Sequence, residues 1–254
     1  MTVDLNSGSG FVYDAALIRP AASEFINSLI DDALESERAA RGRRDYLGAS
    51  RIGEPCARRL CFEMTGVSID DRMEDGRPTL RVFEAGHVLE ELSIRWLRAA
   101  GFDLRNRKRN GDQFGFEIAA GRIRGHIDGV IVNGPDLGLP WPILWEHKSA
   151  STKSWNTFVK RGLETWNGIY WGQVHFYMAY MELEHCLFTA LNKDTLELHH
   201  ELVAYRPSVA QALSDKAVDI LRAVEAGELP PRIAAASDYY LCRSCPFARR
   251  CWQE

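Results

Sequence analysis

Two apolar runs that stand close together in the chain, residues 125–132 and 143–149, decide how it folds. They read Gly125-His126-Ile127-Asp128-Gly129-Val130-Ile131-Val132 and Ile143-Leu144-Trp145-Glu146-His147-Lys148-Ser149. Both have the composition of strands, yet each carries an acid where a strand normally places an apolar side chain. Because side chains alternate faces along a strand, Glu146 and Lys148 share a face, and Asp128 joins them if the runs pair. Two carboxylates and an ammonium make a poor core and a good hard-cation site.

The composition is that of an ordinary globular protein. The chain has 254 residues, of which 46% are hydrophobic and 26% charged, and its formal net charge is -4. We predict a flexible tail at residues 1–20 and a single domain at residues 21–254. The negative charge argues against a generally basic coat for nucleic acid, although short basic clusters allow a local basic groove.

The chain contains no apolar run near the roughly 20 residues that a membrane span needs, and its first residues lack a secretion signal. We therefore expect no membrane partner and a cytoplasmic location, in a bacterium or a phage-infected host. Disulfides are not expected in such a reducing compartment. Clustered cysteines then indicate a metal site. The six cysteines are Cys56, Cys61, Cys186, Cys242, Cys245 and Cys251.

The hydrophobic periodicity predicts six helices and six short strands. The helices are expected at residues 21–41, 54–66, 79–100, 152–161, 166–183 and 207–226. The strands are expected at residues 102–107, 113–118, 122–132, 142–149, 185–192 and 196–203, with loops at 70–78 and 133–140. This order predicts a mixed α/β fold, in which helices flank a mixed central sheet. A helical part (21–78) would precede the core (79–205), and a helix with the cysteine cluster (206–254) would follow it.

One carboxylate falls on the core-facing side of the predicted helix at residues 79–100. Glu90 lies on the apolar stripe, whereas Glu91 lies on a solvated face. A carboxylate on such a stripe needs a partner, which is an ion or, in the simpler alternative, an arginine at the stripe's edge. The stripe is formed by Phe83, Gly86, Ile94 and Leu97. The predicted helix at 21–41 has a similar stripe, formed by Phe25, Leu29, Ile30 and Leu34.

Together, Glu90, Asp128 and Glu146 offer the oxygen ligands that Mg²⁺ or Mn²⁺ prefers. Such an ion lowers the pKa of a bound water and neutralises the charge that grows on a phosphate under attack. The neighbouring Lys148 can orient or deprotonate the water, or stabilise the transition state. These needs match phosphodiester hydrolysis.

The same residues carry a family resemblance. Asp128 followed by Glu146-x-Lys148 resembles the PD-(D/E)XK nuclease signature, with Ile127 in place of the signature's proline. The segment Gly86-His87-Val88-Leu89-Glu90 resembles the preceding helix motif of the RecB-type branch, whose fifth position is His or Glu. Either His87 or Glu90 can complete the site, and both the family spacing and the helix stripe select Glu90. The segment Gln173-Val174-His175-Phe176-Tyr177 matches that branch's Q-x-x-x-Y motif.

The resemblance implies a restriction-endonuclease-like core and a Mg²⁺- or Mn²⁺-dependent deoxyribonuclease, an exonuclease acting on DNA ends or single strands. The ion would be held by Glu90, Asp128, Glu146 and the backbone carbonyl of His147. Lys148 would handle the proton and the charge. Substrate would be positioned by Gln173 and Tyr177, which share a helix face, and by Lys153 just past the catalytic strand.

The cysteines carry a second resemblance. Cys242-x2-Cys245-x5-Cys251, with Cys56 far upstream, resembles the iron–sulfur site of CRISPR-adaptation RecB-like nucleases and AddB-type nuclease domains. It implies a [4Fe–4S] cluster that joins the two ends of the domain around the core. A structural Zn²⁺ on the same thiolates, or cysteines without metal, are the alternatives. Cys61 competes with Cys56, which the family spacing selects, and Cys186 is expected in the core.

The resemblance also indicates a role in DNA recombination, repair or CRISPR adaptation, with DNA as the partner. A homo-oligomer or partner proteins of those pathways are compatible with it. Two other classes of function stay open. One is a nucleic-acid-binding module whose nuclease site no longer cuts, and the other is a zinc-stapled structural protein.

Overall fold

The computed structural model describes residues 15–40, 42, 44–70, 77–136, 138 and 140–253, and side chains from residue 22 and, after the gap, from residue 80. The helices are α1 (Ala15–Ala40), the 3₁₀ turn η1 (Ala49–Arg51), α2 (Ala57–Thr65), α3 (Arg77–Ala99), α4 (Thr152–Trp166), α5 (Gly168–Met181), α6 (Pro207–Ala226), α7 (Tyr240–Arg243) and α8 (Ala248–Gln253). The strands are β1 (Leu47–Gly48), β2 (Leu104–Arg105), β3 (Gly115–Ile118), β4 (Ile123–His126), β5 (Gly129–Ile131), β6 (Ile143–Ala150), β7 (His185–Asn192) and β8 (Leu198–Ala204).

Most predicted elements lie within a few residues of the observed ones. The predicted helix at residues 207–226 coincides with α6, and the predicted strand at 185–192 coincides with β7. The predicted end at residue 161 falls on a kink of α4 at Gly162, whose φ of 71° leaves the helical region. Of the predicted tail, residues 15–20 belong to α1, and residues 1–14 lie outside the described residues. Part of the predicted loop at 70–78 also lies outside them.

A five-stranded sheet in the order β2-β5-β6-β7-β8 forms the centre of the molecule. Strand β6 runs parallel to β7 and antiparallel to β5, so the predicted mixed sheet is confirmed. Helix α3 packs on one face, where Ile143 and Trp145 meet Ile94. On the other face Leu144 packs with Phe158 of α4 and residues of α5. The alternation along β6 therefore turns Glu146 and Lys148 toward the α5 side.

The predicted strand at 122–132 is in fact two strands in two different sheets. Strand β4 pairs with β1 and β3 in a separate three-stranded sheet, whereas β5 pairs with β2 and β6. Residues 127 and 128 form the break, where Ile127 donates its amide to Phe114 O (3.0 Å) and accepts from Gln113 Nε2 (3.0 Å). These bonds satisfy backbone groups that a continuous ladder would otherwise use. Asp128 thus lies at the junction of the two sheets.

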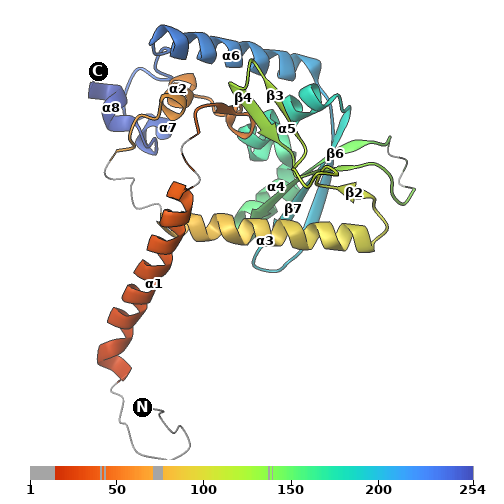
Figure 1. The fold of residues 1–254 in the computed structure, drawn as a ribbon, viewed down its shortest axis with the longest axis horizontal. Helices are drawn as coiled ribbons and strands as arrows, with labels where there is room; N and C mark the ends of the chain where they lie inside the picture. The colour runs from red at the N-terminus through yellow and green to blue at the C-terminus, as the bar shows by residue number, and fades with distance from the viewer. Residues whose placement is uncertain are drawn as a thin grey trace, which may run out of the picture.

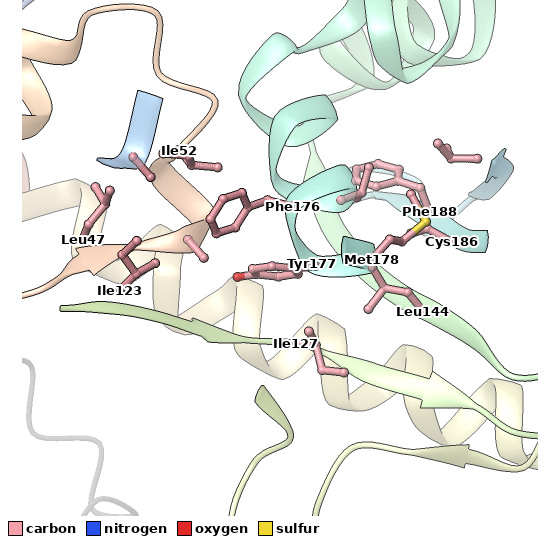
Figure 2. Packing of buried hydrophobic residues seen from close by; sticks show 14 of the residues in the cluster. Leu47, Ile52, Ile123, Ile127, Leu144, Phe176, Tyr177, Met178, Cys186 and Phe188 are labelled. Atoms are coloured by element: carbon pink, nitrogen blue, oxygen red, sulfur yellow. The ribbon is translucent and has the colours of Figure 1, made fainter. Parts of the chain in front are cut away.

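The largest core cluster lies between these two sheets and α5. Figure 2 shows Phe176 and Tyr177 of α5 beside Ile127, with Leu144 and Cys186 behind them. Cys186 is fully buried, so its predicted place in the core is confirmed. This packing fixes α5 over β6, which matters because α5 carries Gln173.

The predicted apolar stripe of α1 is largely exposed, and that of α3 is buried only in its second half. Phe83 of α3 is 60% exposed, and Phe25 of α1 is 65% exposed. The reason is that α1 projects away from the sheets and meets α3 near its first turns (Figure 1), where Arg81 donates to both Asp31 carboxylate oxygens at 2.7 Å. Only the second half of α3, with Ile94 and Leu97, reaches the core. Among the described residues, no helix has the length and apolarity to span a membrane.

Candidate active site

Three carboxylates converge beside the junction of the two sheets. Glu146 of β6 is 0% exposed, and Asp128 accepts a hydrogen bond from the backbone N–H of His147 at 2.8 Å. Glu90 of α3 shares the wall of a cleft with Asp128 and lies close enough for their charges to interact. The structure therefore brings together the three acids that the sequence singled out.

Lys148 lies in the same cluster. Its ammonium donates to Glu146 Oε1 and, at 3.0 Å, to the carbonyl oxygen of His147. The ring of Tyr170 lies beneath it, with 5.2 Å between Nζ and the ring centroid. Burial works against the charge, but attraction to Glu146 and Asp128 outweighs it and raises the pKa of Lys148 above its usual range. The lysine is therefore an ammonium at neutral pH.

The second acceptor oxygen of Glu146 has no N–H donor. Oε1 accepts from Lys148 and from Gln173 Nε2 (2.6 Å), whereas Oε2 is buried beside the Asp128 carboxyl without such a donor. A buried carboxylate oxygen without such a donor is costly, so such an atom calls for an explanation. An ion bound between Glu146 and Asp128 would supply the missing contact.

The pKa values of the three acids also indicate a site for a cation. Burial, followed by repulsion from Asp128, raises the pKa of Glu146 to about 8. The same two causes raise the pKa of Glu90 to about 8. Burial also raises the pKa of Asp128. The three crowded carboxyls are therefore harder to ionise than free ones, and a bound cation would compensate their charge.

His147 links β6 to α3. Its backbone bonds Asp128 and Lys148, while its ring lies on the opposite face of β6 and meets Ser93 Oγ at 3.1 Å. Burial lowers the pKa of His147 to about 3, so the ring is neutral. Ser93 follows Glu90 by one helical turn. The pair therefore fixes the position of α3, and with it Glu90, relative to β6.

The two remaining predicted α5 residues are buried at this site. Gln173 is 4% exposed and Tyr177 is 2% exposed, and both line the cleft that contains Glu146 and Lys148. Burial raises the pKa of Tyr177, which keeps its hydroxyl protonated. Lys153, in contrast, is exposed on the first turn of α4 and lies in the wall of neither cleft.

Sequence reasoning missed the side of the cleft formed by the small sheet. Arg44, Tyr46, Ser50 and Arg124 line the same cleft of about 270 Å³ as Glu146 and Lys148. The guanidinium of Arg124 lies 4.8 Å from the centroid of the Tyr46 ring. Arg44 and Tyr46 precede β1, Ser50 lies in η1 and Arg124 lies in β4. The pairing of β1 with β4 joins distant segments, and no local pattern marks it. A second cleft with Glu90 shares Asp128 in its wall.

The four selected cysteines surround one cavity at the other end of the molecule. Cys56 precedes α2, and the other three lie on or between the short helices α7 and α8, which Figure 1 shows beside α2. Arg58, Arg59 and Arg232 also line the cavity, together with apolar side chains. Burial raises the pKa of the Cys242 and Cys245 thiols. Cys61 is buried outside this cavity, and burial raises its pKa to about 11.

Hydrogen bonds join the segment after α2 to the C-terminal segment that carries three of the cysteines. Asp70, beyond α2, donates its amide to Pro246 O at 2.7 Å, and its carboxylate accepts from the Arg249 amide at 2.7 Å. Arg232 donates to Cys251 O at 2.9 Å. Within the described ranges, no three Cys, His, Asp or Glu side chains already stand in metal-coordinating geometry, either here or at the acids.

The mixed sheet, with an acid at a strand break and a Glu-x-Lys on the next strand, defines a nuclease class. The chain belongs to the PD-(D/E)XK nuclease superfamily, whose family model matches residues 54–252. Nucleases of this superfamily typically use divalent metal ions such as Mg²⁺ or Mn²⁺. No curated protein sequence matches the chain.

Solved structures share the fold at low sequence identity. An alkaline exonuclease (LHK-Exo) from Laribacter hongkongensis superposes with a TM-score of 0.53 at 15% identity, over 74% of this chain and 91% of that one. LHK-Exo in complex with dAMP gives 0.52 at 15% identity, over 72% and 89%. The structure of SSO0001 gives 0.51 at 15% identity and covers 90% of this chain and 95% of that one.

Proposed function

We propose that the chain is a Mg²⁺- or Mn²⁺-dependent deoxyribonuclease of the RecB-like branch that hydrolyses phosphodiester bonds as an exonuclease. One observation carries the proposal: Glu146 Oε2 is buried without an N–H donor among two further carboxyls and a protonated lysine. A divalent ion would contact that oxygen and compensate the charge of the crowded carboxylates.

The ligand set fits a hard cation, because every donor is an oxygen. Glu90, Asp128 and Glu146 would hold the ion with the carbonyl of His147. When bound, the ion supplies a water of lowered pKa and neutralises charge on the phosphate. Asp128 is held in place by the His147 amide, and Glu146 by Gln173, so the ligands are oriented before the ion binds.

Lys148 would handle the proton and the charge. Attraction to Glu146 and Asp128 raises its pKa in the metal-free chain, and this favours the ammonium form. As an ammonium beside Glu146 it can stabilise the negative charge that develops on the phosphate oxygens. Gln173 orients Glu146 through its hydrogen bond, and Tyr177 is buried in the wall of the same cleft, from which the two would position the substrate.

The basic wall of the cleft is suited to the phosphate backbone of DNA. Arg44 and Arg124 flank Tyr46 across the cleft from the acids, and guanidinium groups bind phosphates through paired N–H donors. We extend this contact to Lys153, whose exposed side chain follows the end of β6. An acidic chain can thus bind DNA through a local groove.

The exonuclease assignment draws on structural neighbours that are named alkaline exonucleases, one of them in complex with dAMP. It is tested with DNA labelled at the 5′ or the 3′ end, in single- and double-stranded form. Release of mononucleotides from one end supports the assignment, and internal cuts in circular DNA contradict it. The RecB-like assignment also implies a role in DNA recombination, repair or CRISPR adaptation.

The nuclease reaction itself is tested by removing Lys148. We expect Lys148→Ala to lower the Mn²⁺-dependent cleavage rate about 10³-fold, the range expected when a charge-stabilising group is lost. The matched control is Lys193→Ala, an exposed lysine after β7, and it should cleave like the parent chain. DNA that is bound but not cut by the parent chain would favour the non-cutting nucleic-acid-binding module instead.

We also propose that Cys56, Cys242, Cys245 and Cys251 hold a [4Fe–4S] cluster. In support, all four line one cavity whose three arginines would balance the negative charge of a four-thiolate cluster. The test is anaerobic purification with analysis of iron, sulfide and zinc and of visible absorbance. About four irons per chain with a brown colour support the proposal, whereas a colourless protein with one zinc would replace it by a zinc site.

A further inference from the structure

A close backbone contact between Gly53 and Gly172 joins residues 50–56 to α5. Helix α5 carries Gln173, which donates a hydrogen bond to Glu146. Gly53 follows η1, and a Cβ built on it would lie 2.5 Å from Ile169 Cα and 2.8 Å from Gly168 O. A Cβ on Gly172 would lie 2.8 Å from Gly53 Cα. No side chain fits between these backbones. The segment therefore sets where the first turns of α5 can lie.

Those turns of α5 carry the contacts of the active site. Tyr170 follows Ile169 and lies under the ammonium of Lys148. Gln173 follows Gly172 and donates to Glu146 Oε1 at 2.6 Å. A shift of the Gly168–Gly172 backbone would move both side chains. The glycine contact thus acts on the catalytic strand through α5.

The segment that carries Gly53 is anchored on its other side. Lys216 of α6 donates to the carbonyl oxygens of Ile52, at 2.9 Å, and of Glu54. Glu54 is itself buried, pairs with Arg51 at 3.1 Å and accepts from the Cys56 amide at 3.4 Å. Ser50, at the start of the segment, lines the catalytic cleft. Residues 50–56 therefore extend from the catalytic cleft to the cysteine cavity.

We infer that Gly53 is a positioning residue: by holding α5 against residues 50–56, it sets the affinity of the carboxylate site for its divalent ion. The inference rests on the metal-dependent nuclease proposed above. It assigns the metal affinity partly to a backbone contact outside the ligand set. Lys216 has the same role from the opposite side of the segment, as its anchor.

The test compares two substitutions that add the same methyl group. Gly53→Ala must displace α5, whereas Gly168→Ala, on the same helix, meets nothing within 4 Å. Mn²⁺ affinity is measured by electron paramagnetic resonance titration. We expect Gly53→Ala to weaken Mn²⁺ binding about tenfold or more, since losing a group that orients a metal ligand typically costs roughly 10- to 100-fold in affinity. Gly168→Ala should bind as the parent chain does. Equal affinity in the two variants would overturn the inference.

A second pair of variants covers the case in which Gly53→Ala does not fold. Lys216→Met keeps the length of the side chain but removes the donor, and Lys216→Arg restores one. We expect Lys216→Met to weaken Mn²⁺ binding at least threefold and Lys216→Arg to recover most of it. Parent-like affinity in Lys216→Met would overturn the inference.

A third measurement separates this inference from the proposed function. If the parent chain binds no Mn²⁺, the proposed function fails, and amide hydrogen exchange then tests the contact without metal. Gly53→Ala should exchange faster than Gly168→Ala at residues 169–177 if Gly53 positions α5. Identical exchange in the two variants would remove the positioning role.

Discussion

The carboxylate site and the cysteine cavity of this chain are built in opposite ways. At the first, Asp128 accepts a hydrogen bond from the backbone of β6 and Glu146 accepts one from Gln173 of α5, which is packed in the larger core cluster. The second is assembled from the start of α2 and two short helices of four and six residues. Short helices are not stable on their own in water. The fold therefore supports the carboxylates, whereas the proposed cluster supports the fold around the cysteines.

The largest effect, a loss of thermal stability, should come from removing one of the four cysteines that line the cavity. We expect Cys242→Ser to lower the melting temperature by more than about 10 °C, because the binding energy of a structural metal group is folding energy. Cys61→Ala is the control, since Cys61 lies outside the cavity, and it should cost only a few degrees. Differential scanning calorimetry under anaerobic conditions measures both. Equal shifts in the two variants would mean that the cavity holds nothing that stabilises the chain.

The stability of the metal-free chain should fall as the pH rises, whereas an ordinary ion pair makes a protein more stable as its carboxyl ionises. The pKa of Glu146 is raised from 4.5 to about 8, so its contribution to stability is complete below pH 4.5 and is lost as the pH rises through about 8. The melting temperature of the metal-free chain should therefore fall over this interval, and added Mn²⁺ should reverse the fall. Glu146→Gln should flatten the dependence. A metal-free chain that becomes more stable between pH 5 and 8 would contradict the raised pKa.

Loss of one supporting hydrogen bond should have an intermediate effect. Gln173→Leu removes a donor to Glu146 from a buried position, and we expect kcat to fall about tenfold while KM for DNA changes little. Tyr177→Phe, four residues later on the same face, should cost less, because it retains the packing of the ring. Steady-state kinetics with Mn²⁺ measure the two parameters. A rise in KM alone would mean that Gln173 contacts DNA instead.

The smallest effect is expected at the basic wall. Arg124→Ala should raise KM about threefold to tenfold and reduce the salt dependence of DNA binding by about one unit of slope, as for one phosphate contact. Arg105→Ala is the control, because Arg105 pairs with Asp103 at 2.7 Å outside either cleft. Fluorescence anisotropy at several salt concentrations measures the slope. An unchanged slope in Arg124→Ala would exclude this residue from the DNA path.

The composition of the carboxylate cluster was predictable from sequence because two local rules act there. Strand alternation places Glu146 and Lys148 on one face, and helical spacing places Glu90 on the stripe of α3 that turns inward. The same spacing puts Gln173 and Tyr177 on one face of α5. The superfamily and the mixed fold followed from these positions, while the catalytic and cluster roles of the residues stay predictions.

Other features depend on contacts that local patterns do not contain. The alternation of apolar residues continues through Ile127 and Asp128, so it could not mark the break between β4 and β5. The pairing of β1 with β4 joins residues 47 and 123, and it alone brings Tyr46 and Arg124 to the cleft. The exposure of Phe25 and Phe83 reflects how far α1 and α3 extend beyond the sheets. Residue spacing predicts which face of a helix is apolar, but it does not predict how much of the helix length packs against the sheet.

The position of His147 has a consequence for how the family can vary. Its two catalytic-strand bonds use only backbone atoms, so they constrain the identity of residue 147 very little. Its side chain is constrained by Ser93 instead, across 54 positions of sequence. We therefore expect positions 93 and 147 to change together among relatives. A polar pair should be exchanged for an apolar pair of similar volume, while Asp128, Glu146 and Lys148 stay the same.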